Sequence, residues 1–371
     1  MSDCTTFVGL DVHKESIVAV ALQVSSGEVR RAEFGTDGRS VKKLERWLKR
    51  DVGGRVRCCY EAGQSGYELQ RRLTEAGLEC VVVAPSLVWR KAGDRQKNDQ
   101  RDALKLAQQL AGGLLTAVQA PTVAQEAVRE LVRDREDARQ AVQRMKQQIL
   151  AFLELQGVKH EGATWTQKHR QWLGSVRLGE ADAQFVLTDR LLGLAQGEQR
   201  LAALDARIAE VGQRAEYREA VGRLRCFRGV DTLTAMVFVA ELYSFGRFAS
   251  PRALMAFLGL IPGERSSGER ERGTGLTKTG NGFVRRLMVE AAKHYRQRPG
   301  LSAALRARQE GQPGEVVAGA QQAVRRLHRR YWHLVQRGKS PNTATGAVAR
   351  ELVGCLWAAL QGTSWAAGEA A

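Results

Sequence analysis

The sequence lacks the features that mark membrane proteins, secreted proteins and proteins stabilised by structural zinc. Its six cysteines are scattered and form no CxxC pair, so neither a zinc cage nor a disulfide framework is expected. No apolar run approaches the roughly 20 residues of a membrane span. The start, MSDCTTFVGLDVHKE, carries acids and has no signal-peptide pattern. We therefore expect a cytoplasmic protein with reduced thiols and no membrane partner.

Negative charge is also scarce relative to positive charge. The chain has 57 Lys and Arg against 40 Asp and Glu, a formal net charge of +17, and a pI of about 10.0. Such a surplus suits a polyanion, above all nucleic acid, although a merely basic protein is the alternative. At 371 residues the chain is long enough for two or three domains.

Short apolar runs alternate with polar breaks in the N-terminal part of the chain. The runs within 5–34 predict a three-stranded antiparallel meander. Helices at about 39–50 and 65–77 then alternate with strands at 55–62 and 78–85. The order β-β-β-α-β-α-β is that of an RNase H-like fold with a mixed sheet, whereas periodicity alone supports only an α/β class.

Four acidic residues stand out near the edges of these predicted elements. Asp11 lies inside an apolar strand, where an ionised carboxylate needs a positive partner; it could also be a partnered structural group. Glu61 ends a second strand, and a solvated strand end is its alternative role. Asp99 and Asp102 share one face of a helix start, where capping is the alternative. Carboxylates gathered at one sheet edge can hold two Mg²⁺ ions about 3.5–4 Å apart, and Mn²⁺ suits the same oxygen ligands.

A heptad pattern marks the middle of the chain. Apolar residues follow steps of four and three from Ala124 to Phe152, interrupted only at Arg135, and a second seam runs from Leu187 to Val211. This pattern predicts a coiled coil. The two helices could fold back on each other or pair between chains.

The segment 224–245 predicts a helix, a tight turn and a second helix, with Thr232 as a candidate cap. Helix-hairpin-helix elements use such a turn to present backbone N–H groups to DNA phosphates. The turn of such an element usually has a second glycine, and here Asp231 occupies that position. A plain packed helical turn therefore explains the sequence equally well.

The stretch GERSSGERERGTGLTKTGN (263–281) is too glycine-rich for a stable helix and is expected to form a loop. Its two hydroxyls, Ser266 and Ser267, lie among cations that suit phosphate, although polar loop residues need no further role. The helix predicted to follow would turn two more cations outward. The expected nucleic-acid contacts here are Arg265, Arg270, Arg272, Lys278, Arg285 and Arg286.

A second basic segment, 323–340, contains no acid. Tyr331 and Trp332 lie among its cations, which suits stacking on bases; the alternative is a solvated basic helix with buried aromatic rings. The expected nucleic-acid contacts in this segment are Arg325, Arg326, Arg329 and Arg330.

Three acidic stretches, GLDVHKESIVAVAL, YEAG and KNDQRDALKLA, resemble the acidic blocks of the DEDD transposases, a family that includes the RNA-guided bridge recombinases and the Piv-type DNA invertases. The resemblance implies a RuvC-like N-terminal domain. The acids that it assigns to metal binding and catalysis are Asp11, Glu61, Asp99 and Asp102. The SG pair followed by a basic stretch and TKTGN is similar to the second domain of the family, whose serine joins covalently to DNA. That role falls on Ser267, which precedes Gly268, rather than on Ser266.

The resemblance implies a transposase or site-specific recombinase that cuts and rejoins donor and target DNA, with a guide RNA, in a prokaryotic, nucleoid-associated setting. The expected domains are a RuvC-like catalytic domain (1–120), a coiled-coil linker and dimerisation region (121–215), and a mostly α-helical transposase domain (216–371). Family likeness favours a homodimer or tetramer with composite active sites. Two alternatives remain: a hydrolytic RuvC-like junction resolvase or nuclease, and a non-catalytic nucleic-acid-binding protein.

Overall fold

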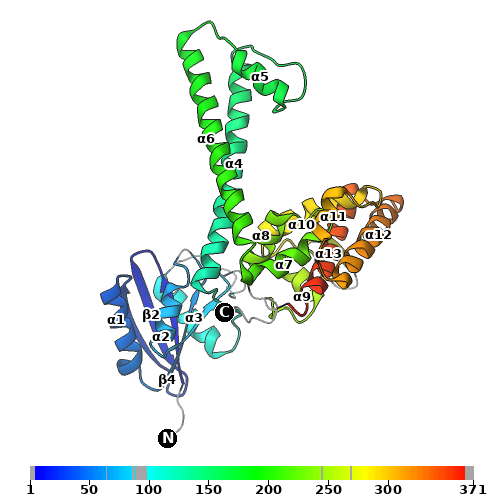
Figure 1. Ribbon diagram of the computed structural model, residues 1–371. Helices are drawn as coiled ribbons and strands as arrows, with labels where there is room; N and C mark the ends of the chain where they lie inside the picture. The colour runs from blue at the N-terminus through cyan, green and yellow to red at the C-terminus, as the bar shows by residue number, and fades with distance from the viewer. Residues whose placement is uncertain are drawn as a thin grey trace. The chain divides into compact units, whose positions relative to one another are not determined.

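The computed structural model describes residues 5–63, 65–85, 88, 98–243, 245–267 and 270–363, and only the backbone within 264–267 and 270–274. The chain divides into two compact units, Met1–Thr122 and Val123–Ala371 (Figure 1). The second unit holds both the long central helices and the C-terminal helices, so the three-part division stays a prediction. Within the described ranges, no helix combines the length and apolarity needed to cross a membrane.

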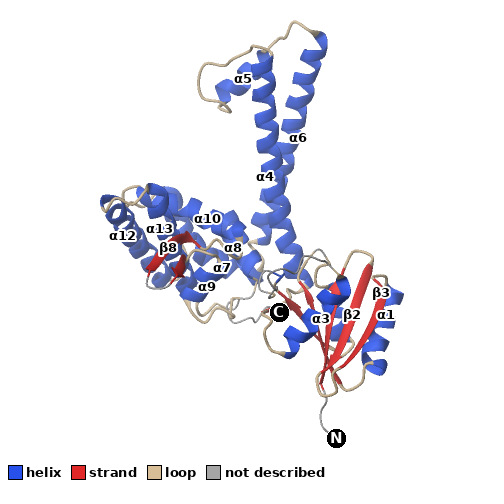
Figure 2. Ribbon diagram, turned by 180° about the vertical axis from the view of Figure 1, so that it is seen from behind, coloured by secondary structure: helices blue, strands red, loops and turns tan. Residues whose placement is uncertain are grey.

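The first unit is built on a six-stranded sheet of order β3-β2-β1-β4-β5-β6 (Figure 2). Its strands are β1 (Thr5–Val12), β2 (Ser16–Gln23), β3 (Glu28–Gly35), β4 (Arg55–Glu61), β5 (Glu79–Val83) and β6 (Ala117–Val118). Strands β1, β2 and β3 pair antiparallel, and β1, β4 and β5 pair parallel. This arrangement confirms the predicted meander and the mixed, RNase H-like sheet.

Helices cover both faces of this sheet. The helices are α1 (Gly38–Arg46), continued by a π-helical turn (Trp47–Asp51), α2 (Glu68–Glu75) and α3 (Asp99–Ala111). Because side chains alternate along a strand, Tyr60 of β4 packs in the core under α1 and α2, while Cys59 packs with Leu106 and Leu110 of α3. The sheet therefore has a separate apolar core on each face.

The second unit begins with a helical hairpin made of α4 (Val123–Leu155) and α6 (Ala181–Val211), with α5 (Gln167–Ser175) in the connection (Figure 1). Ion pairs link the helices in antiparallel order, Lys146 to Glu198 near one level and Arg135 to Asp205 further along. Arg135, the one break in the predicted seam, is thus held by a 2.7 Å ion pair across the hairpin. Of the two arrangements left open by the sequence, the structure shows the one in which the helices fold back on each other.

The remaining helices pack around one large apolar core. They are α7 (Ala215–Arg225), α8 (Thr232–Leu242), α9 (Pro251–Phe257), α10 (Gly282–Lys293), a 3₁₀ turn (His294–Arg296), α11 (Ala303–Gln309), α12 (Gly314–Gln336) and α13 (Pro341–Leu360). A β-hairpin of β7 (Pro262–Ser267) and β8 (Arg270–Leu276) lies between α9 and α10 in sequence. The loop expected at 263–281 is therefore largely strand, because its backbone groups pair across the hairpin.

The turn between α7 and α8 differs from its expected form. Asp231, not Thr232, caps α8, because its side chain accepts a hydrogen bond from the backbone N–H of Thr234. A carboxylate thus occupies the helix N-terminus that a phosphate would need. Gly229 adopts a φ of +81°, and a Cβ there would lie 2.6 Å from the Ala291 carbonyl oxygen. This turn is packed against α10, which favours the packed-turn alternative over the phosphate cradle.

Candidate active site

Two of the predicted acids lie side by side at one edge of the sheet. Parallel pairing of β1 with β4 sets Leu10 opposite Tyr60, so the next residues, Asp11 and Glu61, are neighbours. Gly9, two residues before Asp11, faces α3 closely enough that a Cβ there would lie 1.9 Å from the Ala103 carbonyl oxygen. By strand alternation, Asp11 and Glu61 both lie on the α3 side of the sheet.

The other two acids lie in the first turn of α3. Asn98 caps this helix, because its side chain accepts hydrogen bonds from the backbone N–H groups of Gln100 and Arg101. Neither Asp99 nor Asp102 is therefore needed as the cap. Asp102 forms a 3.2 Å ion pair with Lys105, one turn further along the helix.

His13, in the polar break between β1 and β2, joins the two groups of acids. Its Nε2 lies 3.3 Å from Asp11 Oδ2 and 3.4 Å from Asp99 Oδ2. One ligand atom from each of these three residues lies within 4.8 Å of the others. The signal in the sequence was the spacing, since a residue two positions after Asp11 continues the same face of an extended chain.

The electrostatics of Asp11 point to a missing positive charge. Burial raises the pKa of its carboxyl above the ordinary value, and the nearby His13 opposes the rise. The charges of Asp99 and Asp102 raise this pKa further. Asp11 Oδ2 and His13 Nε2 are buried, and beyond their contacts with each other and with Asp99 neither atom has a hydrogen-bond partner among the residues that the structure describes. A divalent cation would satisfy these atoms, so the residues present fit a metal site.

The predicted nucleophile lies in the second unit. Ser267 is the last residue of β7 and pairs with Arg270, and Ser266 pairs with Glu271. Gly268 and the side chains of Arg265, Arg270 and Arg272 lie outside the described structure. The predicted contacts of those three arginines with nucleic acid therefore stay predictions.

The base of the β7–β8 hairpin is held by specific contacts. The Arg285 guanidinium donates hydrogen bonds to the carbonyl oxygens of Leu258, at 2.9 Å, and Thr279, at 2.7 Å. Asn281 caps α10 and also donates to the buried carboxylate of Glu241, at 2.7 Å. Lys278 adopts a φ of +55° in this turn. Arg285 therefore clamps two backbone segments together, and its contact with nucleic acid stays a prediction.

Arg286 also has internal partners rather than an outward, solvated guanidinium. It lies 2.9 Å from Glu136 of α4 and 3.2 Å from Glu290. Arg139 donates two hydrogen bonds to Glu136 as well. Burial acts to raise the pKa of Glu136, but these hydrogen bonds and the charge of Arg286 outweigh it and lower the pKa to about 2.

The basic segment on α12 presents two kinds of arginine. Arg326 and Arg330 lie 3.3 Å and 3.1 Å from Glu351 of α13. Arg325 and Arg329 are exposed, with no ion pair in the described part of the chain. Tyr331 is buried, as the alternative reading of this segment expected.

Trp332, in contrast to Tyr331, is 43% exposed, and its Nε1 donates to the Arg296 carbonyl oxygen. Two of the four predicted cations on α12 and one of its two aromatic rings are therefore available on the surface.

Comparison with known proteins agrees with this arrangement. A family model for DEDD transposases of the IS110 type matches residues 8–156, and one described as "Transposase IS116/IS110/IS902 family" matches residues 222–305. The chain is 40% identical to the y4qE protein of Sinorhizobium fredii, named as a transposase, over 95% of this chain and 87% of that one. It is 33% identical to the "Transposase for insertion sequence element IS1533" of Leptospira borgpetersenii, over 90% of this chain and 97% of that one.

The first match spans the sheet edge with its four acids, and the second spans the β7–β8 hairpin and α10. Enzymes of this kind cut and rejoin DNA, and the DEDD type implies a divalent metal at its acids. The chain belongs to the IS110 family of DEDD insertion-sequence transposases.

Proposed function

We propose that this transposase cuts and rejoins DNA by transesterification, with Ser267 as the nucleophile and Mg²⁺ or Mn²⁺ held at the sheet edge. The single observation that carries the proposal is the meeting of Asp11, His13 and Asp99, whose ligand atoms lie within 4.8 Å of one another. Glu61 lies beside Asp11, and Asp102 lies one turn after Asp99. These four carboxylates would hold the metal, and His13 Nε2 would join Asp11 and Asp99 as a further ligand atom.

When bound, the metal supplies Lewis-acid stabilisation to the phosphoryl and leaving oxygens. The Ser267 hydroxyl gives its proton to a carboxylate of the edge as its oxygen bonds to phosphorus. The bridging P–O bond of the DNA strand breaks, and the leaving DNA oxygen takes up a proton. One phosphodiester replaces another, so no external energy source is needed. Attack by a hydroxyl of a second DNA strand on the phosphoserine then restores Ser267 and completes the joining.

We further propose that the exposed cations of α12 contact nucleic acid, including a structured guide RNA. Arg325 and Arg329 offer charge without an internal partner in the described structure, and Trp332 offers an exposed ring. Such cations bind phosphate with strong salt dependence, and exposed rings stack on unpaired bases.

The α6 helix supports the proposal that the chain works as a homo-oligomer, a dimer or tetramer, with composite active sites. Away from its seam with α4, α6 has a second set of exposed positions at alternating steps of three and four. These positions are Phe185, Thr188, Leu192, Ala195, Gln199, Ala202, Ala206 and Ala209. None is charged, and Phe185 is 72% exposed. An uncharged heptad face suits pairing with the same face of a second copy.

A denaturing gel tests the nucleophile. The substrate is element-end DNA with a nick beside the cleavage site, so that the cut strand diffuses away and cannot be rejoined, with guide RNA and Mg²⁺ present. We expect a covalent protein–DNA adduct from the unmodified chain and from Ser266→Ala, and none from Ser267→Ala. Asp11→Ala should lose cleavage and keep DNA binding, because it removes no cation.

Two outcomes would contradict this assignment. Efficient cleavage without an adduct would indicate a hydrolytic nuclease that uses water as its nucleophile. An adduct from Ser267→Ala but not from Ser266→Ala would move the role one residue back.

A further inference from the structure

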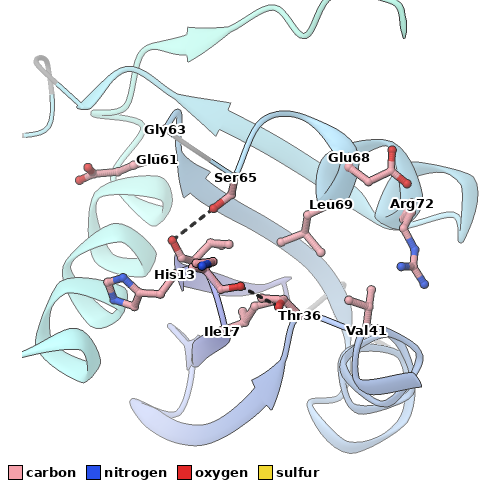
Figure 3. A pocket seen from close by; sticks show the side chains of 12 residues that line it. His13, Ile17, Thr36, Val41, Glu61, Gly63, Ser65, Glu68, Leu69 and Arg72 are labelled. Atoms are coloured by element: carbon pink, nitrogen blue, oxygen red, sulfur yellow. Dashed lines mark hydrogen bonds between the residues drawn. The ribbon is translucent and has the colours of Figure 1, made fainter. Parts of the chain in front are cut away.

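A cavity of about 570 Å³ opens beside the carboxylate edge (Figure 3). His13 and Glu61 form one end of it, so the cavity shares two residues with the edge where the scissile phosphate is proposed to bind. Its volume is within the range of pockets that hold small organic molecules. A group that enters it would therefore be a close neighbour of the reacting phosphate.

The floor and the far end of the cavity have different chemistry. Ile17, Val41 and Leu69 form an apolar floor, and Figure 3 shows Arg72 at the end opposite His13. Among the residues that the structure describes, the Arg72 guanidinium donates one hydrogen bond, from Nη2 to the Gly38 carbonyl oxygen at 3.4 Å. An apolar slot with a cation at its far end suits a flat base whose next phosphate reaches the arginine.

Two hydroxyls line the walls, and both already use their protons. Thr36 Oγ1 donates to the Lys14 carbonyl oxygen at 2.9 Å, and Ser65 Oγ donates to the Val12 carbonyl oxygen at 3.5 Å. Each hydroxyl oxygen can then act toward a ligand only as an acceptor. The carboxylate of Glu68 at the rim is also an acceptor. A base with an exocyclic amino group matches this wall, whereas thymine has only its N3–H to donate, and a carbonyl oxygen on each side of that group faces the acceptors.

We propose that this cavity receives one unstacked nucleotide of the DNA strand, next to the phosphate at the carboxylate edge, and that it favours adenine, cytosine or guanine over thymine. The proposal rests on the proposed function, since that function places a phosphate at the edge. Unstacking a base costs a few kcal/mol and is repaid by burial of its faces and by hydrogen bonds to its edge. The cavity would thereby fix the register of the strand at the cut.

The first test uses the full chain with Ca²⁺ in place of Mg²⁺, and a gel checks that the strand stays uncut. 2-Aminopurine is placed in turn at each position of an element-end strand, and its fluorescence is recorded. We expect one position to increase in fluorescence as the base leaves the stack, and we expect Arg72→Gln to abolish that increase. Arg46→Gln, on the neighbouring α1 helix and outside the cavity, is the matched control and should keep it. No responding position, or a response unchanged in Arg72→Gln, would overturn the proposal.

The second test reads base preference through DNA affinity in Ca²⁺. Thymine at the responding position should weaken binding about tenfold relative to adenine or cytosine, the loss expected for one unmatched polar contact. Thr36→Val removes an acceptor at nearly constant volume and should reduce this preference. Thr74→Val, an exposed change on α2 outside the cavity, should retain it. Equal affinity for all four bases in the unmodified chain would overturn the preference.

These readouts separate the two proposals. If the unmodified chain gives no cleavage with Mg²⁺ but still shows a fluorescence response that Arg72→Gln removes, the proposed function fails and the nucleotide cavity stands. If it forms the Ser267 adduct but no position responds, the cavity inference fails alone.

Discussion

Replacing Gly9 by alanine should disrupt the proposed metal site, because the added methyl group has no room beside α3. A Cβ at this position would lie 1.9 Å from the Ala103 carbonyl oxygen and 2.8 Å from the Ala107 nitrogen, both backbone atoms of α3. Ordinary van der Waals contact begins at 3.4 Å, so α3 would have to retreat by about 1.5 Å. The first turn of α3 carries Asp99 and Asp102, which would move away from Asp11.

We therefore expect Gly9→Ala to lower cleavage about 100-fold, the scale of loss for a misplacement of about 1 Å. Overpacking should lower the free energy of unfolding by about 1–3 kcal/mol. Mn²⁺ affinity, measured by calorimetry, should fall together with cleavage. Gly38→Ala is the matched control, because a Cβ at Gly38 meets only the tip of Arg72 at 4.0 Å. Wild-type Mn²⁺ affinity and cleavage in folded Gly9→Ala would refute the reasoning.

Three other predictions concern the second unit. Because the pKa of Glu136 is about 2 in the folded protein, its stabilising effect is complete above its ordinary pKa of 4.5 and is lost as the pH falls toward 2. Glu136→Gln should thus lower the melting temperature at pH 7, with the difference shrinking below pH 4.5; a pH-independent difference would contradict this. Arg325→Gln and Arg329→Gln should each reduce the slope of log affinity against log salt by about 1; unchanged slopes would count against phosphate contact. Phe185→Glu should lower the oligomer mass in sedimentation while keeping helicity; an unchanged mass would exclude α6 pairing.

The sheet could be predicted from the sequence because its signals are local. Alternation and turn residues within 5–34 determine the meander, and two later apolar runs supply the parallel strands. The heptad seams predicted that the two long helices pack through apolar faces, but left open whether they fold back on each other or pair between chains. Arg135, which interrupts the apolar seam of α4, is compatible with the hairpin because Asp205 of α6 compensates its charge.

The finer parts of the site depend on contacts between residues far apart in sequence. His13 lies in a polar break of the sequence, and only the packing of α3 on the sheet places Asp99 within 3.4 Å of it. Capping was the alternative role for Asp99 and Asp102, but the cap of α3 is Asn98, because capping depends on the direction from which the chain enters the helix. Arg285 looked solvent-facing by helical periodicity, yet two carbonyl oxygens from turns before and after the hairpin capture its guanidinium.

The two halves of the proposed chemistry are held in physically different ways. The carboxylates sit on a sheet and a helix that touch backbone to backbone at Gly9, so their spacing is set before any ligand arrives. The serine-bearing hairpin is fixed at its base, where Asn281 binds the buried Glu241 and Arg133 of α4 binds the same carboxylate at 2.7 Å. The proposed metal site is thus preorganised within the first unit alone, whereas the hairpin that carries the proposed nucleophile is anchored to α4 of the long helical hairpin. Replacing Arg133 by glutamine should accordingly lower the yield of the Ser267 adduct on the denaturing gel, because it loosens the anchor of the hairpin at Glu241. Mn²⁺ affinity in calorimetry should stay unchanged, because the proposed metal ligands all lie in the first unit.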